Sequence, residues 1–301
     1  MFKHILIIGC GLIGSSILRG INEKNISKKI SIFDKSKTVV DFLKKNNLSQ
    51  NITSDISLAA KDADLVIIAT PLSAYKEILL TLKDNLKENV ILTDVGSVKK
   101  EVNKIIENLN LNSVSWIASH PIAGTEDSGP EAGFADLFKG RWCILSSSQK
   151  TKKEDLEKVQ KFWELLGSKV KHMTFEEHDN ILSLTSHLPH AIAYNMVRTA
   201  INNKDRFRDD VIQYSAGGLR DFTRIAASNP IMWSDIFMDN SENILKVLEI
   251  FSDNLDEMKK LIRNKNRDEL IKLFSSTKEV RKEIIKAGQD TEMPDFGRKK
   301  N

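Results

Sequence analysis

The stretch SHPIAGTEDSG contains a lone histidine among residues that form turns and bind polar groups. His120 is followed by Pro121 and Gly124, which fix the local turn, and by the polar side chains of Thr125 and Glu126. A histidine with an unperturbed pKa of about 6.5 is mostly neutral at pH 7, so its ring is suited to proton transfer. An apolar run precedes the stretch, which predicts His120 at the end of a strand. A plain surface turn is the alternative interpretation.

A second stretch, GCGLIGSS, has the spacing G-x-G-x-x-G between an apolar run and a helical pattern. In such a loop Gly9 allows a tight turn, Gly11 lets the backbone approach a pyrophosphate, and Gly14 lets the helix pack on the strand. The N–H groups at the helix start, at Leu12 and Ile13, are then available to phosphate oxygens. The spacing alone is a weak signal, but its strand–turn–helix context predicts a dinucleotide-binding loop.

A carboxylate ends the next apolar run, KISIFD, twenty residues after Gly14. An acidic side chain at this place bonds the adenosine ribose hydroxyls and repels a 2′-phosphate, so Asp34 favours NAD over NADP. Lys35 and Lys37 keep NADP open as an alternative, and a turn residue is the other interpretation of Asp34.

The elements that position these residues alternate between strand and helix through the first half of the chain. Apolar runs that end in small or polar residues are ADLVIIATP, VILTDVGSVK, SWIASHP, RWCILSS and KVKHMT. A helix from about Lys152 to Gly167 carries an apolar face. Because ligands bind at the carboxyl ends of strands in such sheets, Thr70–Pro71 and Ser97 join the candidate site. We predict an α/β class: a Rossmann-type, doubly wound NAD-binding domain over residues 1–174.

From Phe175 onward the strand patterns give way to long apolar helices. Pro189 predicts a kink, and Asn229 is a candidate cap for a helix that starts at Pro230 and continues for about nine turns. A last helix is expected at about 267–286. Helices this apolar are hard to cover within one short segment, so we predict an all-α substrate and dimerisation domain over residues 175–288 that forms a homodimer. Residues 289–301 are expected to be an unstructured tail.

Two further stretches in this helical half carry polar side chains amid apolar residues. His187 and His190 lie three residues apart and therefore share a helix face; a third metal ligand is missing from the pattern, so no metal site is predicted. Arg220 and Arg224 can pair with Asp221, or one can fork a substrate carboxylate. Trp233 lies close to the arginines in sequence. The remaining histidines (His4, His172, His178) read as structural or exposed, and the remaining tryptophans (Trp116, Trp142, Trp163) as core residues.

The bulk composition excludes several classes of protein. The net charge of +4 comes from 45 basic and 41 acidic residues spread along all 301 positions, which indicates a solvated surface rather than a nucleic-acid-binding face. Cys10 and Cys143 stand in unrelated contexts and are expected to be reduced thiols. The first apolar run is too short for a signal peptide or membrane span. We expect a cytoplasmic protein with no membrane or nucleic-acid partner.

Taken together, GCGLIGSS, DVGSVK, SHPIAGTEDSG, SHLPHAIA and GGLRDFTRIAASNPIMW resemble the prephenate and arogenate dehydrogenases of tyrosine biosynthesis over nearly the whole chain. The resemblance implies oxidative decarboxylation of a small cyclohexadiene acid with hydride transfer to NAD. Prephenate would give 4-hydroxyphenylpyruvate and CO₂. Arogenate would give tyrosine, and the sequence leaves both substrates open.

The resemblance also assigns roles to residues. His120 is implied as the proton acceptor, Ser97 as the serine that bonds the hydroxyl and the nicotinamide end, and Arg224 as the partner of a substrate carboxylate. The other residues implied at the substrate are His190, Thr125, Glu126 and Trp233. The residues expected at the cofactor are Gly9, Gly11, Leu12, Ile13, Gly14, Asp34, Thr70, Pro71 and Ser97.

Two other functions remain as alternatives. A β-hydroxyacid-type dehydrogenase would need a catalytic lysine early in the helical half, where this chain has His187 and His190 and no lysine between Lys171 and Lys204. A non-catalytic NAD-binding sensor would leave the His120 stretch and the arginine segment unexplained.

Overall fold

A computed structural model of the chain describes residues 1–49, 51–111, 114–125, 127–202 and 213–287. The chain divides into two compact units, Met1–Ile244 and Leu245–Asn301. The change from strands to helices comes after residue 174, as expected, but the first unit continues through several helices that pack with the sheet. The tail expected at 289–301 lies outside the described residues.

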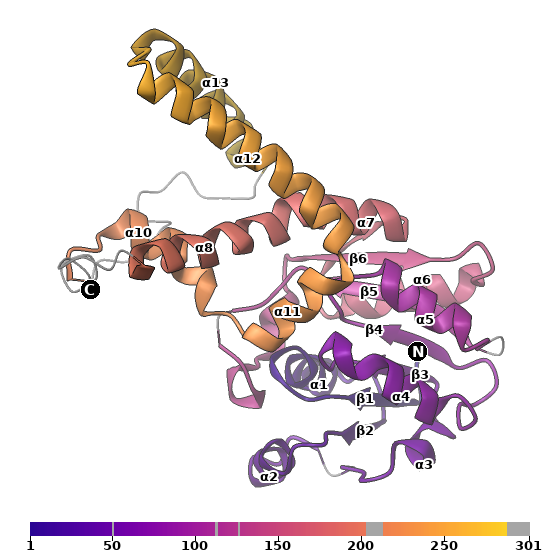
Figure 1. Ribbon diagram of the computed structural model, residues 1–301. Helices are drawn as coiled ribbons and strands as arrows, with labels where there is room; N and C mark the ends of the chain where they lie inside the picture. Colours follow the sequence, from indigo (N-terminus) through magenta and orange to yellow (C-terminus); the bar gives the residue numbers. More distant parts are fainter. Residues whose placement is uncertain (50, 112–113, 126, 203–212, 288–301) are drawn as a thin grey trace. The chain divides into compact units, whose positions relative to one another are not determined.

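The first unit is built on a sheet of seven strands within the described residues, in the order β2-β1-β3-β4-β5-β6-β7 (Figure 1). Neighbouring strands are parallel except for β5 and β6, which are antiparallel. The strands are β1 (His4–Ile8), β2 (Lys29–Phe33), β3 (Leu65–Ile68), β4 (Ile91–Asp94), β5 (Ser115–Pro121), β6 (Trp142–Ser147) and β7 (Lys169–His172).

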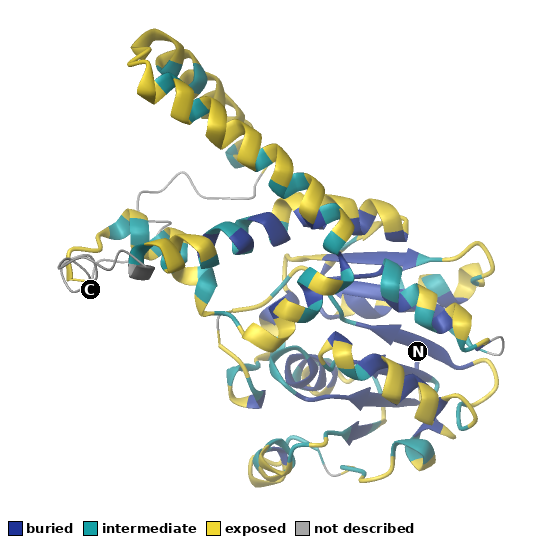
Figure 2. Cartoon of the chain, in the orientation of Figure 1, coloured by how far each residue is buried: buried dark blue, intermediate teal, exposed yellow. Residues whose placement is uncertain are grey.

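Helices cover both faces of this sheet, which confirms the predicted doubly wound α/β class. One face packs against α1 (Leu12–Lys24), α2 (Lys37–Lys45) and α6 (Lys153–Leu165). The opposite face packs against α3 (Ile56–Ala60), α4 (Tyr75–Leu82), α5 (Lys100–Asn108), α7 (Phe175–Leu182) and α11 (Pro230–Asp239). Figure 2 shows the strands as the buried centre between the two helical layers. Near-continuous apolar strands are typical of sheets covered on both faces.

The predicted kink near Pro189 takes the form of a π-helical turn. The π segment Ser183–His187 separates α7 from α8 (Leu188–Asn202), so Pro189 lies in the first turn of a new helix, where its missing N–H costs no hydrogen bond. Further along, α10 (Gly217–Thr223) and a 3₁₀ turn (Arg224–Ala227) lead to α11. The side chain of Asn229 accepts hydrogen bonds from the N–H groups of Ile231 and Met232, which confirms it as the cap.

The prediction of one nine-turn helix after Pro230 is wrong in one respect, because the helix is interrupted at Asn240. Two helices result, α11 and α12 (Ser241–Arg263). Asn240 is buried, and its side-chain amide donates to the carbonyl oxygen of Asp179 at 2.8 Å. That tertiary bond fixes Asn240 with φ −114° and ψ 26°, outside helical geometry. The periodicity of the sequence does not contain this information.

The second unit contains the later part of α12 and α13 (Arg267–Lys286), the last with the predicted bounds. No residue of α13 is buried. Large apolar side chains are exposed along both helices: Leu245, Ile250, Leu255, Ile262, Ile271, Phe274, Val280 and Ile284.

Two of the three tryptophans assigned to the core are there. Trp116 and Trp163 are buried, but Trp142 is 40% exposed and the expectation for it is wrong. Trp142 is the first residue of β6, and its ring lies beneath the Lys169 ammonium, 5.7 Å from the ring centroid. The attraction between the ammonium and the indole ring accounts for a tryptophan at this exposed position.

Candidate active site at the carboxyl ends of the strands

His120 lies within β5, one residue before the strand ends. The strand includes Pro121, so the stretch that starts at Ser119 is extended at first and becomes a loop only afterwards. His120 pairs with Ile144, and Pro121 with Cys143, on the antiparallel neighbour β6. Because side chains alternate along a strand, His120 shares a face with the buried Trp116 and Ala118. That face is the one on which α7 packs.

His120 ends a buried hydrogen-bonded chain of three side chains. Its Nδ1 lies 2.8 Å from Nε2 of His178, and Nδ1 of His178 lies 2.7 Å from Oδ1 of Asp179. All three residues are buried, His120 being 8% exposed. The sequence-based reading of His178 as structural or exposed missed this contact. His178 is one of the groups that meet the candidate proton acceptor directly.

The helix α7 presents both new residues to the sheet. A capping box, in which Thr174 and Glu177 bond each other's backbone N–H, starts the helix. Its buried residues are Phe175, His178, Asp179 and Leu182, spaced as one helix face. This spacing is visible in the sequence and was the available signal that His178 and Asp179 face inward. That they meet His120 is a tertiary fact.

The carboxylate of Asp179 determines which atom donates and which accepts in the hydrogen bonds that link it through His178 to His120. It also accepts hydrogen bonds from the backbone N–H groups of Lys99 and Lys100, both at 2.9 Å. Burial alone would raise the pKa of Asp179, but the bonds from His178 and these N–H groups outweigh it and lower the pKa. The ionised Asp179 accepts the Nδ1–H of His178, so Nε2 of neutral His178 accepts the Nδ1–H of His120. Nε2 of His120 is left with a free lone pair.

Burial keeps the two histidines neutral. It lowers the pKa of His120 well below the ordinary value of 6.5, and the nearby His178, Lys99 and His187 lower it further. Burial also lowers the pKa of His178, against the opposing effect of Asp179. A neutral ring with an oriented lone pair is what a general base at neutral pH requires.

The glycine loop after β1 has the shape of a phosphate cradle. Gly9 has φ +89°, and a Cβ there would lie 2.6 Å from the carbonyl oxygen of Ala69. A Cβ on Gly14 would lie 2.1 Å from the carbonyl oxygen of Gly9, so helix and strand meet at van der Waals distance. A Cβ on Gly11, in contrast, would meet no atom within 4 Å. Gly11 therefore faces open space at the start of α1, which has no side-chain cap.

Asp34 lies beside this loop, as predicted. Its Oδ2 accepts the N–H of Cys10 at 2.7 Å and its Oδ1 accepts the N–H of Ser36 at 2.8 Å. Each carboxylate oxygen retains a second lone pair for a ligand hydroxyl. Thr70 follows β3 on the opposite side of the loop, where its Cγ2 would lie 2.7 Å from a Cβ on Gly9. The loop, Asp34 and Thr70 fit a dinucleotide.

A second group of candidate residues gathers around Trp233. The ring of His190 stacks on Trp233, with centroids 3.6 Å apart and 22° between the planes. His187 approaches the same indole edge-on at 6.0 Å. Burial lowers the pKa of His190 and the positive charge of Arg224 lowers it further, against the hydrogen bond from its Nδ1 to the carbonyl oxygen of Ser186. Arg220 instead pairs with Asp221 at 3.1 Å, the alternative considered for the arginines.

His187 connects the two groups. It is fully buried, and its Nδ1 lies 3.1 Å from the amide nitrogen of Asn240, the same side chain that bonds the carbonyl of Asp179. Burial lowers the pKa of His187 to about 4, against the opposing effect of Asp179, and the proximity of His187 in turn lowers the pKa of His120.

The other predicted residues follow neighbouring strands at the same edge of the sheet. Ser97 is half-buried between β4 and α5, Pro71 is exposed after β3, and Thr125 is exposed and accepts the N–H of Asp127 at 3.3 Å. Glu126 lies outside the described residues.

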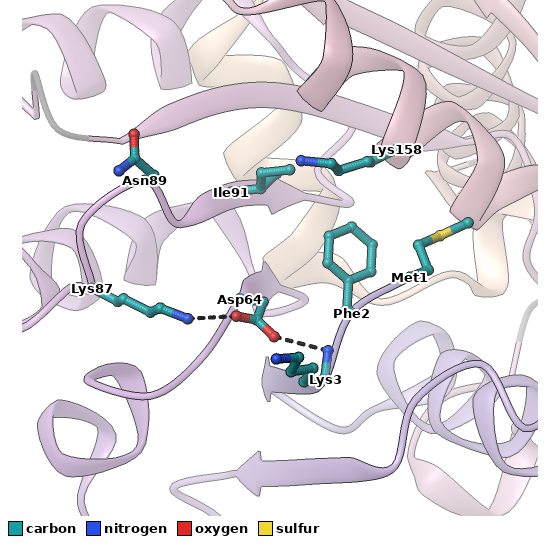
Figure 3. Close-up of a pocket in the computed structure, with 8 residues that line it drawn as sticks. All are labelled: Met1, Phe2, Lys3, Asp64, Lys87, Asn89, Ile91 and Lys158. Carbon is teal, nitrogen blue, oxygen red and sulfur yellow. Dashed lines mark hydrogen bonds and ion pairs between the residues drawn. The ribbon is translucent and has the colours of Figure 1, made fainter.

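The hollow drawn in Figure 3 lies at the opposite edge of the sheet, where the strands begin. Asp64 at its rim accepts the N–H of Lys3 and pairs with Lys87 at 2.6 Å. Phe2 and Ile91 are among the side chains that line it. None of the predicted site residues lines it, so this hollow is separate from the candidate site.

The described residues contain no group of three His, Cys, Asp or Glu side chains arranged to hold a metal ion. Within the same residues, no helix has the length and apolar character needed to cross a membrane.

Both parts of the chain match one protein family. Residues 17–172 match the model for the nucleotide-binding domain of prephenate dehydrogenase, and residues 174–276 match its dimerization domain. A cyclohexadienyl dehydrogenase of Zymomonas mobilis is 39% identical, over 93% of this chain and 96% of its own length. A prephenate dehydrogenase of Bacillus subtilis is 32% identical, over 93% of this chain and 76% of its own length. Among solved structures, prephenate dehydrogenase from A. aeolicus, in complex with hydroxyphenyl propionate and NAD⁺, is 34% identical with a TM-score of 0.88, covering 94% of this chain and 99% of that one.

Proposed function

The chain belongs to the prephenate dehydrogenase family, and from that premise we propose that it oxidises prephenate with NAD, releasing 4-hydroxyphenylpyruvate and CO₂. The observation that carries the proposal is the free lone pair on Nε2 of His120. The chain of hydrogen bonds through His178 to Asp179 orients that lone pair, at the same sheet edge as the glycine loop.

The reaction needs a base for one proton. Prephenate carries a hydroxyl on the ring carbon that loses hydride and a carboxylate on the opposite carbon. Nε2 of His120 accepts the hydroxyl proton while hydride leaves the same carbon. The C–C bond to the carboxylate then breaks, CO₂ departs, and the electron pair enters the ring. The proton returns to the phenolate oxygen, so atoms and charges balance with NADH as the reduced product. Aromatisation drives the reaction, and the protein contributes mainly position and proton transfer.

NAD supplies the hydride acceptor when it is bound. We assign its pyrophosphate to Gly9, Gly11 and Gly14 with the N–H groups of Leu12 and Ile13. Its adenosine ribose is assigned to Asp34 and its nicotinamide end to Thr70, Pro71 and Ser97. The open space above Gly11 and the spare lone pairs of Asp34 support this assignment.

We assign the substrate's other end to the group around Trp233. Arg224 would pair with a carboxylate, because a guanidinium forms two parallel bonds with that group. His190, held flat by its stack on Trp233, would line the same end. Ser97 would bond the ring hydroxyl, and Thr125 and Glu126 would contact the substrate from the loop after β5.

A purified-enzyme assay tests the proposal. NADH formation is measured with prephenate and with arogenate, each with NAD and with NADP. We expect turnover with prephenate and NAD, and a fall of about 10²- to 10⁴-fold in kcat for His120→Asn with NAD binding retained. His172→Asn, at an exposed histidine, is the matched control. Inactivity with all four pairs, or a fully active His120→Asn enzyme, would refute the proposal.

A dual-substrate enzyme is the second candidate. The observation that favours it is the similarity to a cyclohexadienyl dehydrogenase at 39% identity over nearly the full length. The two substrates differ only in a keto or amino side chain, so comparable kcat/KM values for prephenate and arogenate would select this candidate.

We also propose a homodimer formed by the helical part, residues 175–288, with residues 1–174 as the NAD-binding domain. Support comes from α13, which has no buried residue, and from the apolar side chains exposed on α12 and α13. A cytoplasmic location is proposed because Cys10 and Cys143 are buried free thiols. Burial raises the pKa of Cys10 to about 12, so it stays a neutral thiol.

A further inference from the structure

Lys99 places a charged side chain behind the proposed proton acceptor. The side chain is only 1% exposed. Its Nζ donates to Oδ2 of Asp94 at 2.6 Å and to the carbonyl oxygen of Ser119 at 2.8 Å. Ser119 directly precedes His120, so the ammonium connects the end of β4 to the peptide that carries the imidazole.

The backbone of Lys99 contacts the other arm of this arrangement, the Asp179 and His178 side chains of α7 that are hydrogen-bonded to His120. Its N–H donates to Oδ1 of Asp179 at 2.9 Å, and that oxygen also accepts the bond from His178. One residue therefore touches both the strand and the helix that meet at His120. A shift of Lys99 would move the two arms relative to each other.

Stability alone does not explain a buried ion pair at this place. Desolvating two charges is unfavourable, and an apolar pair of similar volume is often as stable. Besides the ammonium, Asp94 accepts three more hydrogen bonds, from the N–H groups of Ser119 at 3.1 Å and Gly96 at 2.9 Å and from the hydroxyl of Tyr75 at 3.2 Å. Such a network fixes one geometry rather than adding stability.

We propose that Lys99 is a positioning residue for the dehydrogenase reaction, fixing the peptide of His120 and the Asp179–His178 arm so that Nε2 of His120 faces the substrate as a neutral base. The ammonium is buried and bonded to Asp94 and to the Ser119 carbonyl, so the role proposed for it is positioning and not contact with the substrate. The proposal rests on the proposed role of His120 as proton acceptor.

The charged and titratable groups around His120 give the proposal a pH signature. They are His178 and Asp179 on α7, His187 in the π turn, Asp94 at the end of β4, Lys99 after it, and Cys143 on β6. After burial and His178, the charge of Lys99 lowers the pKa of His120. Removing the ammonium alone leaves the carboxylate of Asp94 without its partner. The pKa of His120 then rises, and activity is lost at a higher pH than in the wild type.

The test compares Lys99→Met with the double variant Lys99→Met/Asp94→Asn in the full-length enzyme, using prephenate and NAD. For Lys99→Met we expect kcat to fall at least 10-fold with KM for prephenate changed less than about 3-fold. We also expect the acid limb of the kcat/KM profile to move up by about one pH unit. In the double variant the limb should return toward the wild type while kcat stays low, because the Ser119 carbonyl has still lost its donor.

Lys104→Met on α5, which removes an exposed ammonium paired with Glu101, is the control for charge alone and should match the wild type. A folded Lys99→Met enzyme with wild-type kcat or an unmoved acid limb overturns the proposal. If that variant does not fold, the double variant decides: a wild-type kcat there overturns the proposal, and a low kcat with NAD affinity retained supports it. An active His120→Asn enzyme would instead refute the proposed function.

Discussion

Nδ1 of His120 and Nε2 of His178 lie 2.8 Å apart, although 58 residues separate them in the chain. Because Nδ1 of His178 is bonded to Asp179, the contact requires His120 to carry its proton on Nδ1. The tautomer of His120, and so the availability of Nε2 as a base, depends on His178. In this sense His178 is to His120 what an orienting carboxylate is to the histidine of a hydrolase triad.

Replacing His178 should therefore impair turnover more than binding. In His178→Phe the acceptor for Nδ1–H of His120 is lost, and we expect kcat to fall on the order of 10²-fold with little change in KM. In His178→Gln the amide oxygen can take the place of Nε2, so kcat should recover in part. Steady-state kinetics of the two variants at equal folded fractions check this. Equal losses in both variants would show that His178 acts through packing alone.

The lowered histidine pKa values also predict how activity depends on pH. A base of pKa 6.5 is about three-quarters protonated at pH 6, but burial lowers the pKa of His120 well below that value. We expect kcat/KM for prephenate to stay near its plateau at pH 6 and to fall only under more acidic conditions. A profile that halves near pH 6.5 would contradict the neutral, buried state of His120.

The same lowered pKa values make the free energy of unfolding depend on pH. His120, His178 and His187 have lowered pKa values in the folded protein, that of His187 to about 4, so the unfolded chain binds more protons below pH 6.5. Their stabilising contribution is complete above pH 6.5 and is lost as the pH falls from there toward the folded-state pKa values. Each of these histidines should lower the free energy of unfolding by up to about 1.4 kcal/mol per pH unit in that window. Urea unfolding at pH 7.0, 6.0 and 5.0 measures the slope; a flat stability over this range would exclude the effect.

Much of the first unit could be predicted from its sequence because the signals are local. Apolar runs define the strands, and the glycine spacing defines the cradle in which Gly14 packs against Gly9. Asn229 caps its helix through bonds two and three residues away. The direction of β6 could not be predicted, since a buried strand has the same apolar pattern whether it runs parallel or antiparallel to its neighbour.

The part of the site that escaped prediction depends on distant contacts. His178 has an inward-facing helical spacing, yet no local signal tells which side chain it will meet. Lys99 follows a strand, and its sequence context does not distinguish it from an exposed lysine. Only the folded structure brings Asp94 and the Ser119 carbonyl to its ammonium. Asn240 interrupts a helical pattern only because Asp179 and His187 occupy its amide. The side chain of each of these buried polar residues is bonded to at least one partner that lies 20 to 61 positions away in the sequence.

The glycines of the cradle should separate cofactor binding from stability. A Cβ at Gly11 meets no protein atom, so Gly11→Ala should fold normally, within about 0.5 kcal/mol of the wild type. It should bind NAD at least about 10-fold more weakly, because the methyl group fills the space where backbone and pyrophosphate meet. Gly14→Ala is the contrast: its Cβ would overlap the carbonyl oxygen of Gly9, and we expect a loss of about 1–3 kcal/mol in stability. Fluorescence titration and urea unfolding distinguish the two, and tight NAD binding by Gly11→Ala would contradict the assigned pyrophosphate position.

The exposed apolar residues of α13 predict where the proposed homodimer can be disrupted. Phe274 and Val280 are 53% and 56% exposed, on a helix without a single buried residue. Isolated helices of this kind are marginal in water, so a partner surface must cover them. The wild type should therefore have twice the 34.0 kDa mass of one chain in light scattering.

A buried glutamate at either position should weaken association by about 2 kcal/mol, roughly 30-fold in Kd. Lys278→Glu, on an exposed polar position of the same helix, controls for the added charge. If Phe274→Glu and Val280→Glu remain dimeric at nanomolar concentration, the interface lies elsewhere.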